Sequence, residues 1–351
     1  MDPRLRWDDD GGLNAMASTL YLGRQEWLKP LREGYKTTFN EVATRALITH
    51  EDKVLLVYEG HLDSWWLPGG RIKPGENMLS GLAREIEEET ALQTQLGDLV
   101  GFFDVVLSDS GKNANKHIFH FIFAATPDQA PDFIERDHFD TDPDHPGKVS
   151  KMRWFTLDEL QATPNVYPAC IRNWPALLAA RPKAYYGTKL EDGKTAIENI
   201  ERFYISTRVV TTHDDRILMV YNRKGDFWYG PGGQIEFGED LHACATREVM
   251  EETGLPAQAG DVIAVDEFYS PTYGLHQINL YTRCHLAHDQ LPDGWTDIGS
   301  DGHVDKCAFH TPEQLAALPR AYPAYMAELA WPVRQPVIPA QAGIHVKAHA
   351  S

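Results

Sequence analysis

Apolar and polar residues follow two patterns that return later along this chain. The short β-branched and aliphatic runs "KVLLVY" (53–58) and "RILMVY" (216–221) predict strands. "HIFHFIFAA" (117–125) and "HQINLYTRC" (276–284) predict later strands of the same sheets. We therefore expect each half of the chain to build a sheet from comparable strands.

Two segments that begin at Asn77 and Asp240 predict helices, with Asp240 as an N-cap. Apolar residues recur there every four positions and form one buried stripe. The stripe residues are Met78, Leu82 and Ile86 in the first segment and Leu241, Ala245 and Val249 in the second. A shorter helix is predicted near "LDELQA" and "PEQLAA". Strands mixed with two helices, without strict βαβ alternation, predict an α/β sandwich in which helices flank a mixed sheet.

An internal duplication organises the chain. Segments 44–58 and 154–169 reappear as 207–221 and 309–324, at offsets of 163 and 155 residues. Repeats of this length are whole domains rather than solenoid units. We expect two domains of roughly 130 to 140 residues, each with its own core. The expected organisation is an N-terminal extension (1–38), a first domain (39–180), a linker (181–198), a second domain (199–331) and a flexible C-terminal tail (332–351).

Charge and cysteine usage narrow the function classes. The 33 basic and 51 acidic residues give a net charge of −18, which argues against a nucleic-acid polymer as partner. A polyphosphate substrate would need cations to mediate its contact with such a protein. The cysteines have no CxxC spacing, so neither a zinc site nor a disulfide framework is predicted, and a reducing cytoplasmic setting fits best. No apolar run is long enough to predict a membrane span, and no signal peptide is recognisable.

Both predicted helices carry clustered acidic residues after a glycine turn. At 100° per residue, the three glutamates of each helix fall within an arc of roughly 100° beside the apolar stripe. They are Glu85, Glu88 and Glu89, and Glu248, Glu251 and Glu252. Carboxylates this close raise one another's proton affinity unless a cation neutralises them, and Mg²⁺ is suited to that role. A lone acidic run is usually a solvated helix face, but the fixed spacing to a glycine, met twice, weighs against that reading.

The glycine turns precede these helices as "PGG". Gly69, Gly70, Gly232 and Gly233 would let the backbone approach a ligand without an intervening side chain. The combination predicts a metal and phosphate site at a loop–helix junction. Aromatic residues before each turn could stack on a nucleobase, but we expect most of them to pack in the core; they are Trp65, Trp66, Phe227, Trp228 and Tyr229.

The spacing of these residues resembles the signature of the Nudix hydrolases. Gly70, five residues, Glu76, seven residues and "REIEEETAL" follow that signature, and the second copy matches it at every position. The first copy departs once, with Ala91 in place of a glycine that often takes the left-handed conformation. Alanine there costs about 1 kcal/mol, which is tolerable. The resemblance implies two Nudix-type α/β/α sandwich domains with a loop–helix–loop catalytic motif.

The resemblance also implies a chemistry. In this family the clustered glutamates bind Mg²⁺ or Mn²⁺ and help to activate water, which points to the six glutamates named above. Arg84 and Arg247 would orient them, with Glu76 and Glu239 as salt-bridge partners. The implied reaction is hydrolysis of a nucleoside diphosphate linked to another moiety, such as ADP-ribose, a dinucleoside polyphosphate, a sugar nucleotide or a nucleoside triphosphate. The implied partner is this small molecule, without a nucleic-acid polymer or a membrane.

Several alternatives stay open at this point. A remote catalytic base is not identifiable, and the candidates are Glu135, Asp137, Asp140, Glu267, Asp297 and Asp301. Pro271, sixteen residues beyond the second motif, is typical of ADP-ribose enzymes, whereas nearby Tyr269 and Tyr273 are typical of dinucleoside polyphosphate enzymes.

Two function classes compete. The first is a metal-dependent pyrophosphohydrolase whose second domain is the surer enzyme. The alternative is a sensing or scaffolding protein in which one or both domains bind a nucleotide without turnover. Because many family members pair, the two halves could also pack as an intramolecular pseudo-dimer. The strand histidines His117, His120 and His276, and the turn histidines His50 and His213, are interpreted as structural.

Overall fold

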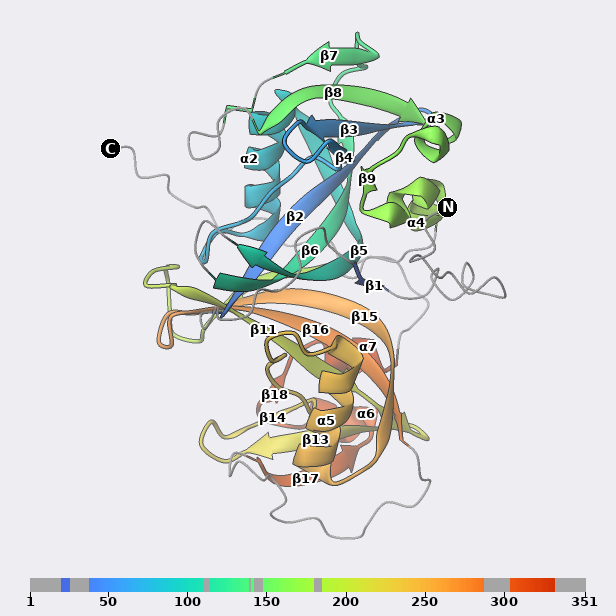
Figure 1. Cartoon of the computed structure of the whole chain (residues 1–351). Coiled ribbons are helices and arrows are strands. Elements are labelled where there is room, and N and C mark those ends of the chain that lie inside the picture. Colours follow the sequence, from blue (N-terminus) through green and yellow to red (C-terminus); the bar gives the residue numbers. More distant parts are fainter. Residues whose placement is uncertain are drawn as a thin grey trace.

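The structure is a computed structural model that describes residues 20–25, 38–109, 114–138, 140–141, 148–179, 185–286 and 304–331. Two α/β units follow one another along the chain and lie in the upper and lower halves of Figure 1. Each unit combines a mixed sheet with helices, so the predicted fold class is confirmed. Within these ranges, no helix is long and apolar enough to cross a membrane.

The first unit is built on a mixed sheet with the strand order β1-β5-β6-β2-β3-β4-β9, extended by β8 on β3 and β7 on β8. Its strands are β1 (Tyr21–Arg24), β2 (Thr38–His50), β3 (Lys53–Glu59), β4 (Ser64–Trp66), β5 (Thr94–Asp109), β6 (Ala114–Pro127), β7 (Glu135–Asp137), β8 (Val149–Thr156) and β9 (Val166–Tyr167). The long strand β2 pairs in parallel with β6 and, near its end, antiparallel with β3. It therefore holds the two parts of the sheet together.

The helices of the first unit are α2 (Met78–Thr90), α3 (Leu157–Ala162), the 3₁₀ helix η1 (Ala169–Asn173) and α4 (Trp174–Ala179). Helix α2 begins where expected, because the Asn77 side chain accepts hydrogen bonds from the amides of Leu79 and Ser80. It ends at Ala91, which has a left-handed φ of 55°. The residue in place of the signature glycine thus adopts the conformation expected of a glycine.

The second unit contains two sheets with the strand orders β10-β15-β16-β11 and β12-β13-β14-β18, with β17 paired to β13. Its elements are β10 (Tyr185–Leu190), β11 (Arg202–Val210), β12 (Thr212–His213), β13 (Arg216–Asn222), β14 (Phe227–Tyr229), α5 (Leu241–Thr253), β15 (Ala257–Ser270), β16 (Leu275–Leu286), β17 (Val304–His310), α6 (Pro312–Ala316), β18 (Ala321–Tyr322) and α7 (Met326–Ala330). Strands β11 and β12 together take the place of β2. Asp240 caps α5, as predicted, by accepting from the amides of His242 and Ala243.

Two strands lie outside the expected domain limits. Strand β1 falls within the segment expected to be an N-terminal extension, and it pairs in parallel with β5. Strand β10 falls within the expected linker, and it pairs in parallel with β15. Both complete the edge of a sheet, so residues 185–190 of the expected linker do more than join two domains. The expected tail, 332–351, lies outside the described residues.

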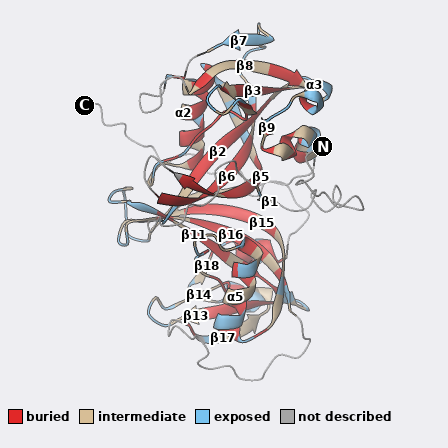
Figure 2. Ribbon diagram, viewed as in Figure 1, coloured by how far each residue is buried: buried red, intermediate tan, exposed pale blue. Residues whose placement is uncertain are grey.

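The apolar core does not divide at the domain boundary. One cluster of buried side chains contains Phe102, Phe119 and Phe121 of the first unit together with Val265 and Ile278 of the second. Figure 2 shows buried strands on both sides of the region where the units meet. The expectation of two separate cores is therefore wrong for this part of the protein, because a single cluster holds buried side chains from β5, β6, β15 and β16. Other clusters lie within single units.

Candidate active sites

The first "PGG" turn is fixed against strand β2 by backbone hydrogen bonds. The amide of Thr44 donates to the carbonyl oxygen of Gly70 (2.9 Å). Gly69 has a φ of +132°, and a Cβ at this position would lie 2.2 Å from the Thr44 carbonyl oxygen. A Cβ on Gly70 would lie 2.2 Å from the nearer carboxylate oxygen of Glu85. The backbone therefore requires a glycine at Gly69, whereas a side chain at Gly70 would displace the Glu85 carboxylate.

The first helix directs Glu85 and Glu89 at this turn. Glu89 is 1% exposed and accepts a hydrogen bond from the amide of Gly69 (2.8 Å). Burial raises the pKa of Glu89 to about 7, although nearby cations and the hydrogen bond from the Gly69 amide lower it. Burial also raises the pKa of Glu85. Both carboxylates, which lie beside the apolar stripe of the helix, are thus largely shielded from solvent.

The second site repeats this frame. Gly232 has a φ of +140°, and its Cβ would lie 2.2 Å from the carbonyl oxygen of Thr207. Its amide donates to Glu252 (2.8 Å), as the Gly69 amide does to Glu89. A Cβ on Gly233 would come within 2.5 Å of the Glu248 carboxylate. Burial raises the pKa of Glu252 to about 7 and also raises the pKa of Glu248.

One arginine gathers the carboxylates of each motif. Arg84 donates to Glu76 (2.9 Å), Glu85 (2.8 Å) and Glu88 (2.8 Å). The expected Arg84–Glu76 salt bridge is thereby confirmed.

In the second site, Arg247 donates to Glu239 (2.8 Å), Glu248 (2.8 Å) and Glu251 (3.1 Å). The expected Arg247–Glu239 salt bridge is also confirmed. In both sites the arginine joins the glutamate of the loop to those of the helix, which fixes the loop–helix junction.

The first site contains a lysine that the sequence reasoning missed. Lys148 Nζ lies 3.2 Å from Glu89 and 3.2 Å from Glu59, a buried glutamate at the end of β3. The ammonium thus bridges a motif carboxylate and a carboxylate outside the motif. Lys148 lies between the two aligned parts of the repeat, where the offset changes, so the repeat gave no signal for it.

The second site contains a phenol at the corresponding place. The Tyr229 hydroxyl donates to Glu252 (2.9 Å), so this strand aromatic contacts the site instead of only packing. Its counterpart Trp66 is 2% exposed and stacks on Tyr167. Arg208 donates to the carbonyl oxygen of Gly232, as Arg45 does to that of Gly69. These paired arginines could have been found from their shared repeat offset.

The donor chemistry of both sites fits a hard divalent cation. Glu252 is buried and ionisable, and its hydrogen-bond partners, the Gly232 amide and the Tyr229 hydroxyl, are neutral. A divalent ion would offset the cost of keeping these buried carboxylates charged, and burial is the main cause of their raised pKa values. In this structure the arginines occupy part of the carboxylate surface, and among the described residues no three acidic, histidine or cysteine side chains converge on one point.

Burial excludes one of the candidate catalytic bases and one of the candidate substrate-contact tyrosines. Glu267 is fully buried and its carboxylate is bonded to His276 (2.8 Å), so it is wrong as a catalytic base. Tyr269 is also fully buried, whereas Tyr273 is 71% exposed. Glu135 and Asp137 lie on the exposed strand β7.

Asp140 is buried. The next residue, Thr141, donates its backbone amide to the carbonyl oxygen of Glu88 near the end of α2 (3.3 Å). Asp297 and Asp301 lie outside the described residues. The strand histidines are buried, in agreement with the structural role expected of them.

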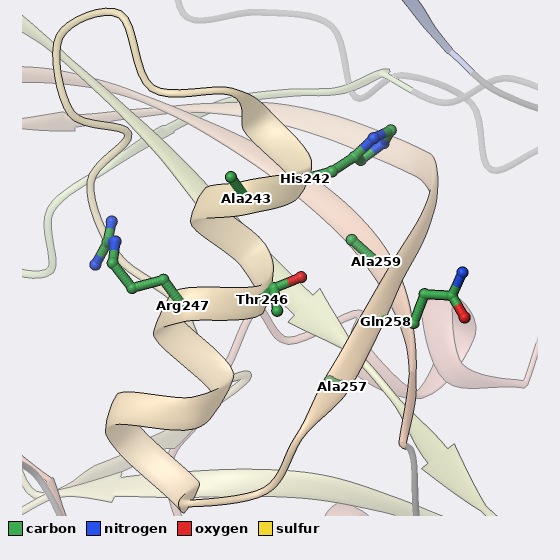
Figure 3. A pocket seen from close by; sticks show the side chains of 7 residues that line it. All are labelled: His242, Ala243, Thr246, Arg247, Ala257, Gln258 and Ala259. Carbon is green, nitrogen blue, oxygen red and sulfur yellow. The ribbon is translucent and has the colours of Figure 1, made fainter.

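A hollow of about 560 Å³ lies between α5 and the start of β15 (Figure 3). It is lined by His242, Ala243, Thr246, Arg247, Ala257, Gln258 and Ala259. Arg247 is the only motif residue in its lining, and none of the six glutamates reaches it. The hollow is therefore separate from the carboxylate cluster.

Comparison with known proteins agrees with this geometry. The family model described as NUDIX domain matches residues 40–174 and 203–330, which is most of the chain. Two glycine turns, two capped helices and two sets of clustered glutamates lie within these matches. The chain therefore belongs to the Nudix hydrolase family and contains two Nudix domains.

Individual relatives match only parts of the chain. The Bacillus subtilis (strain 168) protein "Uncharacterized Nudix hydrolase YvcI" is 24% identical over 127 residues, covering 36% of this chain and 73% of the relative. "Diphosphoinositol polyphosphate phosphohydrolase 2" of Rattus norvegicus is 38% identical over 74 residues, covering 21% of this chain and 40% of the relative. A solved Nudix hydrolase from Nitrosomonas europaea is 23% identical, with a TM-score of 0.32, covering 41% of this chain and 91% of that structure. The chain thus spans less than half of the rat relative.

Proposed function

We propose that the chain is a metal-dependent pyrophosphohydrolase that cleaves a nucleoside diphosphate linked to another moiety, with its main activity in the second domain. The observation that carries the proposal is the environment of Glu252. This buried carboxylate faces the Gly232 amide and the Tyr229 hydroxyl, without a cationic side chain within salt-bridge distance among the described residues. Arg208 donates to the Gly232 carbonyl oxygen and lowers the pKa of Glu252 from a distance, without an ion pair to it, so the carboxylate stays open to a cation from solution.

Glu248, Glu251 and Glu252 would hold Mg²⁺ or Mn²⁺, which would neutralise the diphosphate and lower the pKa of a bound water. Arg247 orients Glu248 and Glu251 through its hydrogen bonds, and Glu239 in turn holds Arg247. The Gly232 amide fixes one oxygen of Glu252. The similarity to the rat protein named diphosphoinositol polyphosphate phosphohydrolase 2 supports phosphoanhydride cleavage as the reaction.

A second function is favoured for the first domain. Lys148 already pairs with Glu89 and Glu59, so an ammonium group lies beside the carboxylate that is expected to bind a metal ion. We propose that the first domain binds a nucleotide diphosphate without efficient turnover, as a sensor or scaffold. A reducing cytoplasmic setting remains part of the proposal, supported by the four free cysteines.

The test is product release from a panel of ADP-ribose, NADH, dinucleoside polyphosphates, sugar nucleotides and oxidised nucleoside triphosphates, with Mg²⁺ or Mn²⁺. Wild type is compared with Glu89→Gln and Glu252→Gln. We expect Glu252→Gln to remove hydrolysis of the preferred substrate by at least about 100-fold, with Glu89→Gln close to wild type. Hydrolysis that depends on Glu89 alone would reverse the assignment, and folded wild type that cleaves nothing would favour the sensing function for both domains.

A further inference from the structure

Each domain contains a buried acid–histidine pair outside its Nudix motif. In the first domain, His117 Nε2 on β6 lies 2.8 Å from Asp104 on β5. In the second, His276 Nε2 on β16 lies 2.8 Å from Glu267 on β15, and Glu267 follows Asp104 by the repeat offset of 163. All four side chains are at most 3% exposed. Burying such pairs is costly unless their polar atoms are satisfied, so their partners matter.

The partners of Glu267 include the first helix of the other domain. The amide of Met78, the first residue of α2, donates to Glu267 at 3.2 Å, and the Asn77 side-chain amide donates at 3.2 Å. First-turn amides of a helix have no partner within the helix, and the helix dipole favours a negative charge there. Glu267 therefore caps α2 from the second domain, beside the local cap Asn77.

The opposite contact is built from different residues. Asp104 is bonded to Arg24 (2.7 Å) and Tyr21 (2.6 Å) of the segment around β1. Arg24 then donates to the carbonyl oxygens of Gly238 (3.0 Å) and Glu239 (3.0 Å), in the turn that leads into α5.

The histidine of the first pair reaches the same turn. The Gly238 amide donates to His117 Nδ1 (3.3 Å). Because Nδ1 accepts this hydrogen bond, Nε2 carries the proton that is donated to Asp104. The turn held in this way includes Glu239, whose side chain holds Arg247 of the second site.

We propose that each buried pair positions the Nudix motif of the other domain. Glu267 positions α2 and hence Glu85 and Glu89, while the Arg24–Asp104 contact positions the turn that holds Arg247. Helices α2 and α5 are each 13 residues long, and the glutamates expected to bind metal lie in their last two turns. Movement of a helix at its first turn changes the carboxylate distances to the glycine turn. The two domains thus depend on each other in a crossed manner, as a pseudo-dimer within one chain.

Hydrogen exchange tests this crossing without any substrate. We compare Glu267→Gln, Arg24→Met and, as a control within the second domain, Glu191→Gln, whose carboxylate is bonded to Ser270 and Thr272. Glu267→Gln should speed exchange of the amides of residues 78–80 by about threefold to tenfold and leave residues 241–243 unchanged. Arg24→Met should speed exchange of the 238–240 amides, with 78–80 unchanged. The control should change neither segment.

The proposal is contradicted if Glu267→Gln speeds amide exchange in α5 of its own domain, if exchange in α2 and α5 changes equally, or if exchange changes in neither helix. Thermal unfolding of each variant separates this from global loss of stability, because global unfolding accelerates exchange in all protected segments alike. Arg24→Lys, which retains a donor and the charge, should restore at least part of the protection at 238–240.

An activity test deepens the proposal and rests on the proposed function. Arg24→Met should lower kcat of the second site by about threefold to tenfold with KM nearly unchanged, although Arg24 lies in the first domain. If the hydrogen-exchange changes appear in the opposite domain but the chain cleaves no substrate, the positioning proposal holds and the proposed function is wrong. If the chain hydrolyses substrate but the exchange changes do not appear in the opposite domain, the proposed function holds and the positioning proposal is wrong.

Discussion

The last glutamate of each Nudix helix occupies the same frame but has different neighbours. Glu89 and Glu252 both accept from the amide of a glycine with positive φ, and burial raises the pKa of both to about 7. In the first domain Lys148 and Glu59 complete the surroundings of Glu89. In the second, Tyr229 donates to Glu252. The shared motif therefore fixes the position of the carboxylate, and residues outside the motif decide its charge environment.

This difference separates two meanings of an intact motif. Every acidic position is present in both domains, so the motif alone suggests equal sites. A fixed ammonium beside a carboxylate competes with a metal ion for the same negative charge, whereas a neutral phenol does not. The first site is consequently expected to bind divalent metal more weakly than the second.

The largest expected effect concerns the frame that both sites share. Gly232→Ala places a Cβ 2.2 Å from the Thr207 carbonyl oxygen at a φ of +140°, and Gly69→Ala does the same at Thr44. Each should lower the free energy of unfolding by about 2–4 kcal/mol. Gly238→Ala is the matched control, because its φ is +75° but no atom lies within 4 Å of the added Cβ. Its cost should be about 1 kcal/mol in urea unfolding; equal costs at Gly232 and Gly238 would contradict the close-contact argument.

The next effect is a pH dependence of stability in metal-free protein. Because the pKa of Glu252 is raised from 4.5 to about 7, the folded protein binds this proton more tightly than the unfolded chain. The stability that this group contributes is complete below pH 4.5 and is lost as the pH rises through about 7. The difference in free energy of unfolding between Glu252→Gln and wild type should therefore shift in favour of the variant by roughly 1–3 kcal/mol between low pH and pH 8. Thermal unfolding in chelator measures the gain; a stability difference that does not change with pH would contradict the raised pKa.

Removal of the first-site ammonium should strengthen metal binding there. Lys148→Met, made in the Glu252→Gln background, should increase the Mn²⁺ affinity of the first site by about tenfold, because Glu89 and Glu59 lose their cation. Titration calorimetry gives the affinity. Lys148→Arg keeps the charge and serves as control. Equal affinities for the Met and Arg variants would show that the lysine does not set the difference between the sites.

The smallest expected effect concerns the phenol of the second site. Tyr229→Phe removes the hydrogen bond to Glu252 while keeping the ring. We expect a loss of about 0.5–1.5 kcal/mol in the free energy of unfolding and a further upward shift of the Glu252 pKa. The pH profile of metal binding reports the shift. A profile identical to wild type would remove Tyr229 from the account.

Local signals made much of the frame predictable from sequence. The cap Asp240 follows from residue type, the start of the first helix near Asn77 follows from the apolar stripe, and the Arg84–Glu76 bridge follows from the family resemblance. The neighbours that distinguish the sites could not be predicted in this way, because Lys148 reaches Glu89 across 59 positions of the chain. Contacts between domains were equally hidden, since Glu267 approaches Met78 from 189 positions away.

The strands β1 and β10 show a further limit. Each contributes only a short edge to a sheet and has little periodic pattern of its own, so the local pattern predicts only an extension and a linker there. Their structure depends on pairing with the long strands β5 and β15. Predictions from local pattern thus succeed for α2 and α5, whose caps and apolar stripe are contained within one segment.

Mn²⁺ titration of the substrate-free chain tests the central claim, the unequal metal sites, most directly. Wild type is compared with Glu89→Gln and Glu252→Gln at constant pH and ionic strength. The account predicts that Glu252→Gln removes the tighter binding event, while Glu89→Gln leaves it in place. Loss of the tighter event in Glu89→Gln, with Glu252→Gln unchanged, would contradict it.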